Sequence, residues 1–256
     1  MTSTVDPILN FWNERARLGE QAGTNDIVMK ELEMRCLASH VKDGLSVLEI
    51  GCGNGLTALD LAQRYGLAID AFDFSPDMIA AAQQRLQSAM LKGSVNFAVG
   101  DVRSLPAERY DYDLAYSERV LINLPDWASQ AAAIKAVVSR LKIGGRYLML
   151  ENSKDGLDVI NQMRLTVGLE QIAPPWHNRY LCESEINALQ IEGIKLQAVE
   201  AIGSTYYFIS RVINAWQAKL ENEIPRYDAP INQLALLLPP VGNFGQTKLW
   251  IWERVA

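Results

Sequence analysis

A strand, a glycine-rich turn and a helix follow one another in residues 47–62, and this order constrains the fold more than any other stretch. Residues 47–50 are mostly apolar and of strand length, glycines stand at 51, 53 and 55, and apolar residues then recur at helical spacing. Glycine permits positive φ and a close approach of the backbone to a ligand, because it has no Cβ. The segment predicts a β–turn–α unit whose turn either binds a ligand or simply joins strand to helix.

The spacing of the glycines excludes the dinucleotide-binding fingerprint. That fingerprint needs glycine at its first, third and sixth positions, whereas the sixth position here is Leu56. The spacing is instead Glu49-x-Gly51-x-Gly53-x-Gly55, which resembles the first motif of the class I S-adenosylmethionine (SAM) methyltransferases. The resemblance implies that SAM is the cofactor and that Glu49 and the three glycines belong to its site.

A second candidate SAM contact lies at the end of the next predicted strand, residues 68–73. Ionised Asp73 is acceptor-only and can take hydrogen bonds from two ribose hydroxyls. The alternative, that Asp73 merely starts a turn, is weaker because Ser75 already supplies the cap of the following helix. Phe74 and Met78 are expected either to flank the adenine or to join the core.

Two further strand ends complete the predicted cofactor site. After a strand at 95–99, the resemblance implies that Asp101 accepts the adenine amine and that Val102 covers the ring edge, although Gly-Asp is also a common turn. The next strand delivers Ser117 and Glu118 to its carboxyl end, where ligands collect in open α/β sheets. We therefore expect Ser117 and Glu118 near the methyl group of SAM.

The alternation of strands and helices predicts an α/β fold, a doubly wound, seven-stranded and mostly parallel sheet with helical cap insertions. The resemblance covers residues 45–151, the SAM-binding core. The resemblance also implies that the last two strands are 194–201 and 248–252, with the final one antiparallel. Residues 152–181 and 203–246 are then substrate-cap insertions within the same domain.

Residues 1–44 read as an N-terminal helical lid. Trp12 and Arg15 fall in its first helix, and in the resembled family such helices often close over the cofactor. Arg15 is expected to meet the SAM carboxylate. For Trp12 the alternative is an aromatic anchor that only packs.

Three residues are candidates for taking the proton of a substrate. His177, in a loop rich in proline and aromatic residues, is the first candidate base, although it equally suits a loop histidine bonded to backbone. Glu118 and Glu151, at the ends of predicted strands, are the runners-up, and salt bridges with Arg119 or Arg146 are their alternative role. No aspartate pair follows Glu118, which favours metal-independent transfer.

The net charge, the lengths of the apolar stretches and the cysteines limit the kinds of partner and compartment that suit this chain. The formal net charge of −6 disfavours nucleic acid, and no apolar stretch is long enough for a membrane span. Three separate cysteines and the lack of a signal-peptide pattern suit a cytoplasmic protein.

The leading functional hypothesis is methyl transfer to an oxygen of a small molecule or glycan, by a monomer or homodimer. The alternatives are methylation of a nitrogen on a peptide or small amine, and a non-catalytic SAM-binding protein, because a fold alone does not fix activity.

Overall fold

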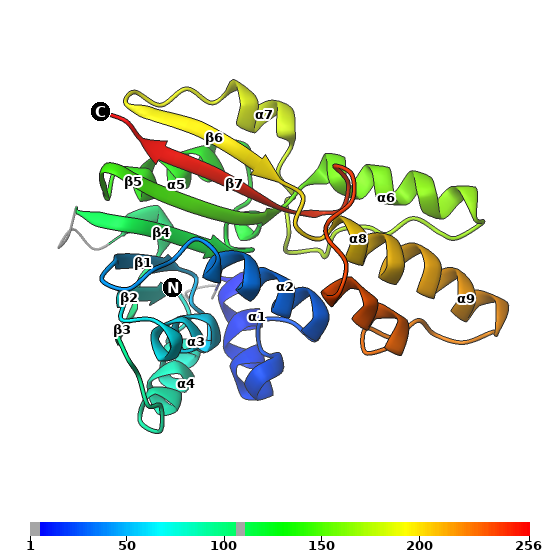
Figure 1. Cartoon of the computed structure of the whole chain (residues 1–256), viewed down its shortest axis with the longest axis horizontal. Helices are drawn as coiled ribbons and strands as arrows, with labels where there is room; N and C mark the ends of the chain where they lie inside the picture. Colours follow the sequence, from blue (N-terminus) through cyan, green and yellow to red (C-terminus); the bar gives the residue numbers. More distant parts are fainter. Residues whose placement is uncertain (1–5, 106–110) are drawn as a thin grey trace, which may run out of the picture.

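Strands and helices alternate along the first 150 residues and build one sheet covered on both faces (Figure 1). The computed structural model describes residues 6–105 and 111–256. The strands are β1 (Ser46–Ile50), β2 (Ala68–Asp73), β3 (Ser94–Val99), β4 (Tyr112–Glu118), β5 (Leu141–Asn152), β6 (Ile194–Glu200) and β7 (Thr247–Arg254). The α-helices are α1 (Pro7–Arg15), α2 (Ile27–Ala38), α3 (Leu56–Arg64), α4 (Pro76–Leu86), α5 (Trp127–Val138), α6 (Lys154–Thr166), α7 (Glu183–Ala188), α8 (Ser204–Tyr207) and α9 (Ala215–Leu220).

The seven strands lie in the order β3-β2-β1-β4-β5-β7-β6. Neighbours from β3 through β5 pair in parallel, whereas β7 runs antiparallel to both β5 and β6. The predicted fold class, a mostly parallel seven-stranded sheet with an antiparallel last strand, is therefore confirmed. The strand order reverses between β1 and β4, so their carboxyl ends flank the crevice where open α/β sheets bind ligands.

Apolar side chains cover both faces of the sheet because successive residues of a strand point to opposite sides. In β5, Leu148 and Leu150 pack in the core cluster that includes residues of α3 and α4. Their neighbours Tyr147 and Met149 pack in the opposite cluster, with residues of α5 and α7. The central strands β1 and β4 are consequently buried on both sides and are rigid supports for their connecting turns.

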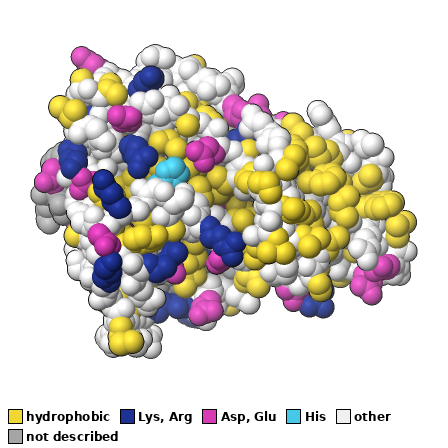
Figure 2. All heavy atoms as spheres, viewed as in Figure 1, with side chains coloured by type: hydrophobic (Ala, Val, Ile, Leu, Met, Phe, Trp, Pro, Cys, Tyr) yellow, Lys and Arg dark blue, Asp and Glu magenta, His cyan; other side chains and the backbone are white. Residues whose placement is uncertain are grey.

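Helices α6, α8 and α9 lie beyond the carboxyl ends of the parallel strands (Figure 1). A π-helix (Phe208–Asn214) separates α8 from α9. A 3-10 helix (Pro230–Leu236) follows them. Exposed apolar side chains gather over α9 and the end of the 3-10 helix, among them Trp216 and Leu237 (Figure 2).

Across residues 6–105 and 111–256, the structure contains no helix with the length and apolar character that crossing a membrane requires.

Candidate active site

The turn between β1 and α3 holds three glycines in the left-handed region, with φ of +69° at Gly51, +52° at Gly53 and +78° at Gly55. A Cβ on Gly51 would lie 2.2 Å from Val120 Cγ2, and one on Gly55 would lie 2.6 Å from Phe97 Cζ. A Cβ on Gly53 would meet nothing within 4 Å. Gly51 and Gly55 therefore serve close packing as well as backbone conformation, whereas Gly53 serves conformation and leaves the turn open to a ligand.

Asp73, the last residue of β2, is held against this turn. Its Oδ2 accepts the Gly53 N–H at 2.8 Å, and its Oδ1 accepts the Ser75 N–H at 2.8 Å. Burial raises the pKa of Asp73 to about 6, against the lowering effect of these two backbone hydrogen bonds. A carboxylate has about four acceptor positions, so two remain for hydroxyl groups of a ligand.

The turn and Asp73 border a cavity of about 350 Å³ at the carboxyl ends of β1, β2 and β4. The sequence-predicted residues that line it are Trp12, Gly51, Gly53, Asp73, Phe74, Met78, Asp101, Val102 and Glu118. Further lining residues, which sequence patterns did not single out, include Thr24, Lys30, Asn54, Thr57, Arg103, Arg119 and Asn123. The volume falls in the range usual for sites of small molecules and cofactors.

Asp101 and Arg103 form the rim of the cavity beyond β3. The Asp101 carboxylate accepts from the Arg103 backbone N–H at 2.8 Å and, through Oδ2, from the guanidinium Nε at 2.9 Å. Burial raises the pKa of Asp101, but these hydrogen bonds outweigh it and the net pKa is lowered. Asp101 is therefore an ionised acceptor at neutral pH.

A buried ion pair lies at the other end of the cavity. Lys30 Nζ of α2 is 2.6 Å from Glu118 Oε2, and the Thr57 hydroxyl donates to the same oxygen at 2.7 Å. Burial raises the pKa of Glu118, but the charge of Lys30 and its hydrogen bond outweigh that effect and lower the net pKa. Glu118 stays ionised and is a poor general base. Its other oxygen, Oε1, is buried with no hydrogen-bond partner among the described residues.

Arg119 follows Glu118 with φ of +56°, a conformation that few non-glycine residues adopt. Its Nη1 is 2.7 Å from Glu33 Oε1 of α2. Burial raises the pKa of Glu33 to about 7, against the opposing charge of Arg119. Strained backbone of this kind gathers at functional sites. No sequence motif marked Lys30, Glu33 or Arg119, because their partners lie far away along the chain.

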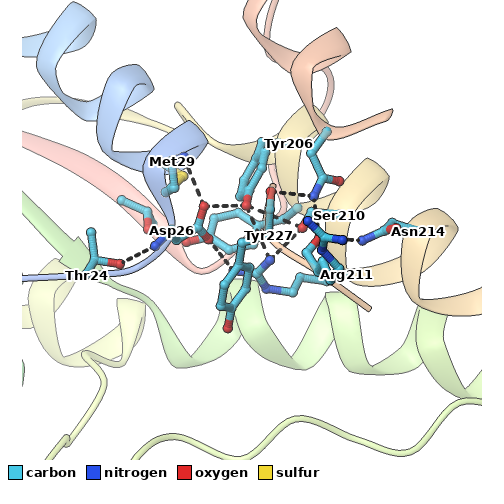
Figure 3. A network of polar contacts seen from close by, with 12 residues as sticks. Thr24, Asp26, Met29, Tyr206, Ser210, Arg211, Asn214 and Tyr227 are labelled. Carbon is cyan, nitrogen blue, oxygen red and sulfur yellow. Dashed lines mark hydrogen bonds and ion pairs between the residues drawn. The ribbon is translucent and has the colours of Figure 1, made fainter. Parts of the chain in front are cut away.

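Asp26, at the start of α2, belongs to a polar network that extends into the π-helix (Figure 3). Asp26 caps α2 by accepting the Met29 N–H, and its Oδ2 is 2.6 Å from Arg211 Nη2 in the π-helix. Tyr206 donates to Asp26, and the Arg211 guanidinium lies 4.5 Å from the centre of the Tyr227 ring. The π-helix is thereby joined to α2, the helix that carries Lys30.

Ser117 and Glu151 do not reach the cavity, which corrects their predicted roles as cofactor contact and base. Glu151 accepts the backbone N–H groups of Val120, Leu121 and Ile122 at 3.0–3.3 Å and the Ser117 hydroxyl at 3.1 Å. The Ser117 side chain points away from the Glu118 side chain because neighbours on a strand face opposite sides. Both residues support the turn after β4 from behind.

Glu49 and Arg15 are also placed differently from the prediction. Glu49 is fully buried below the turn and does not line the cavity, and burial followed by the charge of Glu118 raises its pKa to about 8. The Arg15 guanidinium donates to the carbonyl oxygens of Ala22 and Gln21, at 2.5 and 2.7 Å. Arg15 thus closes its own loop, and Lys30, Arg103 and Arg119 are cationic residues that do line the cavity.

His177 lies one side chain away from the cavity. Its ring centre is 4.3 Å from that of Phe11 and 6.0 Å from that of Trp12, which lines the cavity and donates to Asn123 Oδ1 at 3.2 Å. Burial, followed by the charge of Arg15, lowers the pKa of His177, so its imidazole is neutral at neutral pH. Its Nδ1 is buried without a hydrogen-bond partner in the described part of the chain.

Comparison with known proteins agrees with this arrangement. Residues 47–145 match a family model described as a methyltransferase domain. The magnesium-protoporphyrin O-methyltransferase of Rhodobacter capsulatus is 39% identical over 83 residues, 32% of this chain and 36% of that protein. The demethylmenaquinone methyltransferase of Lactococcus lactis is 31% identical over 121 residues, 46% of each chain. The chain thus spans less than half the length of these curated relatives.

Solved structures share the fold over most of the chain. The magnesium protoporphyrin IX methyltransferase of Synechocystis, with bound SAH, has a TM-score of 0.55 at 19% identity and covers 99% of this chain and 90% of its own. The [4+2]-cyclase SpnF has a TM-score of 0.58 at 19% identity and covers 87% of this chain and 80% of its own.

Residues 47–145 therefore match a methyltransferase domain, and the sheet order is that of a Rossmann-like fold. Over this part of the chain the protein is similar to SAM-dependent methyltransferases.

Proposed function

We propose that this protein transfers the methyl group of SAM to an oxygen atom of a small molecule, without a metal at the reacting atoms. The observation that carries the proposal is Asp73, a buried carboxylate fixed by the Gly53 N–H with acceptor positions left for two hydroxyls. SAM supplies a methyl group already activated on a sulfonium. The work left to the protein is orientation, which is worth up to about 7–11 kcal/mol of a barrier.

The charges at the two ends of the cavity fit the two ends of SAM. Asp73 and Asp101 suit the ribose hydroxyls and the adenine amine, while Phe74 and Met78 supply apolar walls for the ring. At the other end, the unpartnered Glu118 Oε1 suits an ammonium group, and Lys30 suits a carboxylate. The ammonium and carboxylate of an amino acid need this pairing of opposite charges, since a charge removed from water must be compensated.

We assign His177 as the base that accepts the substrate proton. Its neutral imidazole and its unpartnered Nδ1 support the assignment, whereas Glu118 is tied to Lys30 and Glu151 to backbone N–H groups. His177 packs against Trp12, which lines the cavity, so a movement of the Trp12 side chain would bring the imidazole closer to a bound substrate. The curated relatives include O-methyltransferases, which supports an oxygen acceptor.

The test uses SAM with a ¹³C-labelled methyl group and a pool of small metabolites. The carbon shift of the product separates methyl on oxygen from methyl on nitrogen. We expect an oxygen product, and the variant His177→Ala to transfer roughly 10²–10⁴ times more slowly while SAM binding is kept. Trp176→Ala, in the same loop, is the matched control. A nitrogen product would favour an N-methyltransferase, and turnover unchanged in His177→Ala would remove the base.

The same experiment also tests a different function, SAM binding without methyl transfer. The [4+2]-cyclase has the same fold, so this fold also supports chemistry other than methyl transfer. Tight SAM binding without transfer to any compound in the pool would show that the protein binds SAM without acting as a methyltransferase.

A further inference from the structure

A second cluster of metal-ligating side chains lies apart from the cavity. Cys36 stands in the last turn of α2, His40 in the turn that follows, and Glu200 at the end of β6. One ligand atom from each, the Cys36 thiol sulfur, a His40 ring nitrogen and a Glu200 carboxylate oxygen, all lie within 4.8 Å of one another. None of the three lines the cavity.

The donor set is selective in its chemistry. A thiolate, an imidazole and a carboxylate together are the ligands of Zn²⁺, with bonds of about 2.3 Å to sulfur and 2.0–2.2 Å to nitrogen and oxygen. Hard cations such as Mg²⁺ prefer oxygen ligands and avoid thiolates. Bonds of these lengths place the donors roughly 3–4 Å apart. A rotation of the exposed Glu200 side chain closes the remaining gap.

The three donor atoms have no competing partner. In residues 6–105 and 111–256, no hydrogen bond or ion pair to another side chain engages the Cys36 sulfur, the His40 ring or the Glu200 carboxylate. Zn²⁺ binds cysteine as the thiolate and histidine as the neutral imidazole, so metal binding would release the thiol proton.

We propose that Cys36, His40 and Glu200 bind one Zn²⁺, with water as the fourth ligand. The ion joins the end of α2 to the end of β6, two elements that are far apart in sequence. Since α2 also carries Lys30 and Glu33, which pair with Glu118 and Arg119 at the cavity, the metal would hold this helix in place. The cluster lies outside the cavity, so the ion would not contact a ligand bound there.

The proposal is tested by titrating tag-free protein with Co²⁺, whose absorption reports thiolate and imidazole ligation, and then with Zn²⁺ in competition. We expect one ion per chain, a thiolate-to-cobalt band, and full displacement by Zn²⁺. Cys36→Ser should abolish the band, and His40→Gln should weaken binding at least tenfold. Cys182→Ser, at the other partly buried cysteine, is the matched control and should bind as the wild type does.

Zn²⁺ should also raise the melting temperature of the wild type in proportion to the logarithm of its concentration, and not that of Cys36→Ser. Circular dichroism verifies that each variant is folded, and His40→Gln serves if Cys36→Ser does not fold. The proposal is overturned if no thiolate band forms, or if the band survives Cys36→Ser and disappears in Cys182→Ser. Titration of the same samples with SAM measures the affinity of the cavity for SAM separately from metal binding.

Discussion

The two ends of the cavity are built in different ways. The nucleoside end takes its residues from the turns that directly follow β1, β2 and β3, and each turn lies within a few residues of its strand. The amino-acid end joins α2 to the end of β4, and Lys30 and Glu118 are 88 residues apart. The first end depends on backbone shape and the second on buried charges. Substitutions should therefore affect the two ends differently.

The largest effect is expected from removing the cation at the amino-acid end. In Lys30→Met the Glu118 side chain, 8% exposed, loses its partner, and the free energy of unfolding should fall by about 3–5 kcal/mol. Urea denaturation measures the change. The double variant Lys30→Met/Glu118→Gln should recover most of the loss, because no buried charge is left unpaired.

Lys92→Met is the matched control, since its pair with Asp43 is about half exposed on both sides and should contribute little to the free energy of unfolding. Equal losses in Lys30→Met and Lys92→Met would contradict the distinction between buried and exposed pairs.

At the nucleoside end, two neighbouring glycines should respond unequally. Gly51→Ala places an alanine in the left-handed region, which lowers the free energy of unfolding by about 1–2 kcal/mol. Its Cβ also overpacks against Val120, which costs about 1–3 kcal/mol more. Gly53→Ala meets no neighbouring atom and should cost only the backbone share. The free energy of unfolding in urea compares them, and a larger loss in Gly53→Ala would show that the packing at Gly51 is misjudged.

Replacing Asp73, the proposed acceptor for the ribose hydroxyls, should weaken SAM binding. Asp73→Ala is expected to weaken SAM binding by about 1.5–3 kcal/mol, roughly 10- to 150-fold, the scale of hydrogen bonds to a charged group. Isothermal titration calorimetry measures it. Asp77→Asn, at an exposed position four residues further on, is the control and should bind SAM as the wild type does. Equal affinity in Asp73→Ala would refute the ribose assignment.

The smallest expected effect is a dependence of SAM affinity on pH. The pKa of Asp73 is raised to about 6, and only the ionised carboxylate accepts both hydroxyls. Affinity for SAM should be constant above that pKa and fall as pH drops through it, by about tenfold for each unit below. Titrations between pH 5 and 7 should show this slope in the wild type and a flat profile in Asp73→Asn. A flat wild-type profile would indicate that Asp73 ionises normally.

The contrast between the two ends also explains what the sequence could predict. Glycine spacing and the acids at strand ends are local patterns, so the fold and the residues Asp73, Asp101 and Val102 at the cavity followed from the sequence. Ser117 and Glu118 are adjacent, and the sequence did not indicate which of them faces the ligand.

The partners of buried charges were not predictable in the same way. Arg15 and Lys30 are both basic residues of the N-terminal helices, and only the folded chain shows that Arg15 bonds to its own loop while Lys30 meets Glu118. Likewise, the strand-end position of Glu151 suggested catalysis, but its oxygens are occupied by the backbone of the next turn. Long-range pairing, which leaves no periodic signal, decides these roles.

The most direct test of the account is a calorimetric titration of the wild-type protein with SAM, and with NAD as the comparison ligand. We expect one SAM bound per chain and no binding of NAD, since Leu56 stands where the dinucleotide turn needs its third glycine. Absence of heat with SAM, or saturable binding of NAD in its place, would contradict the assignment of the cavity.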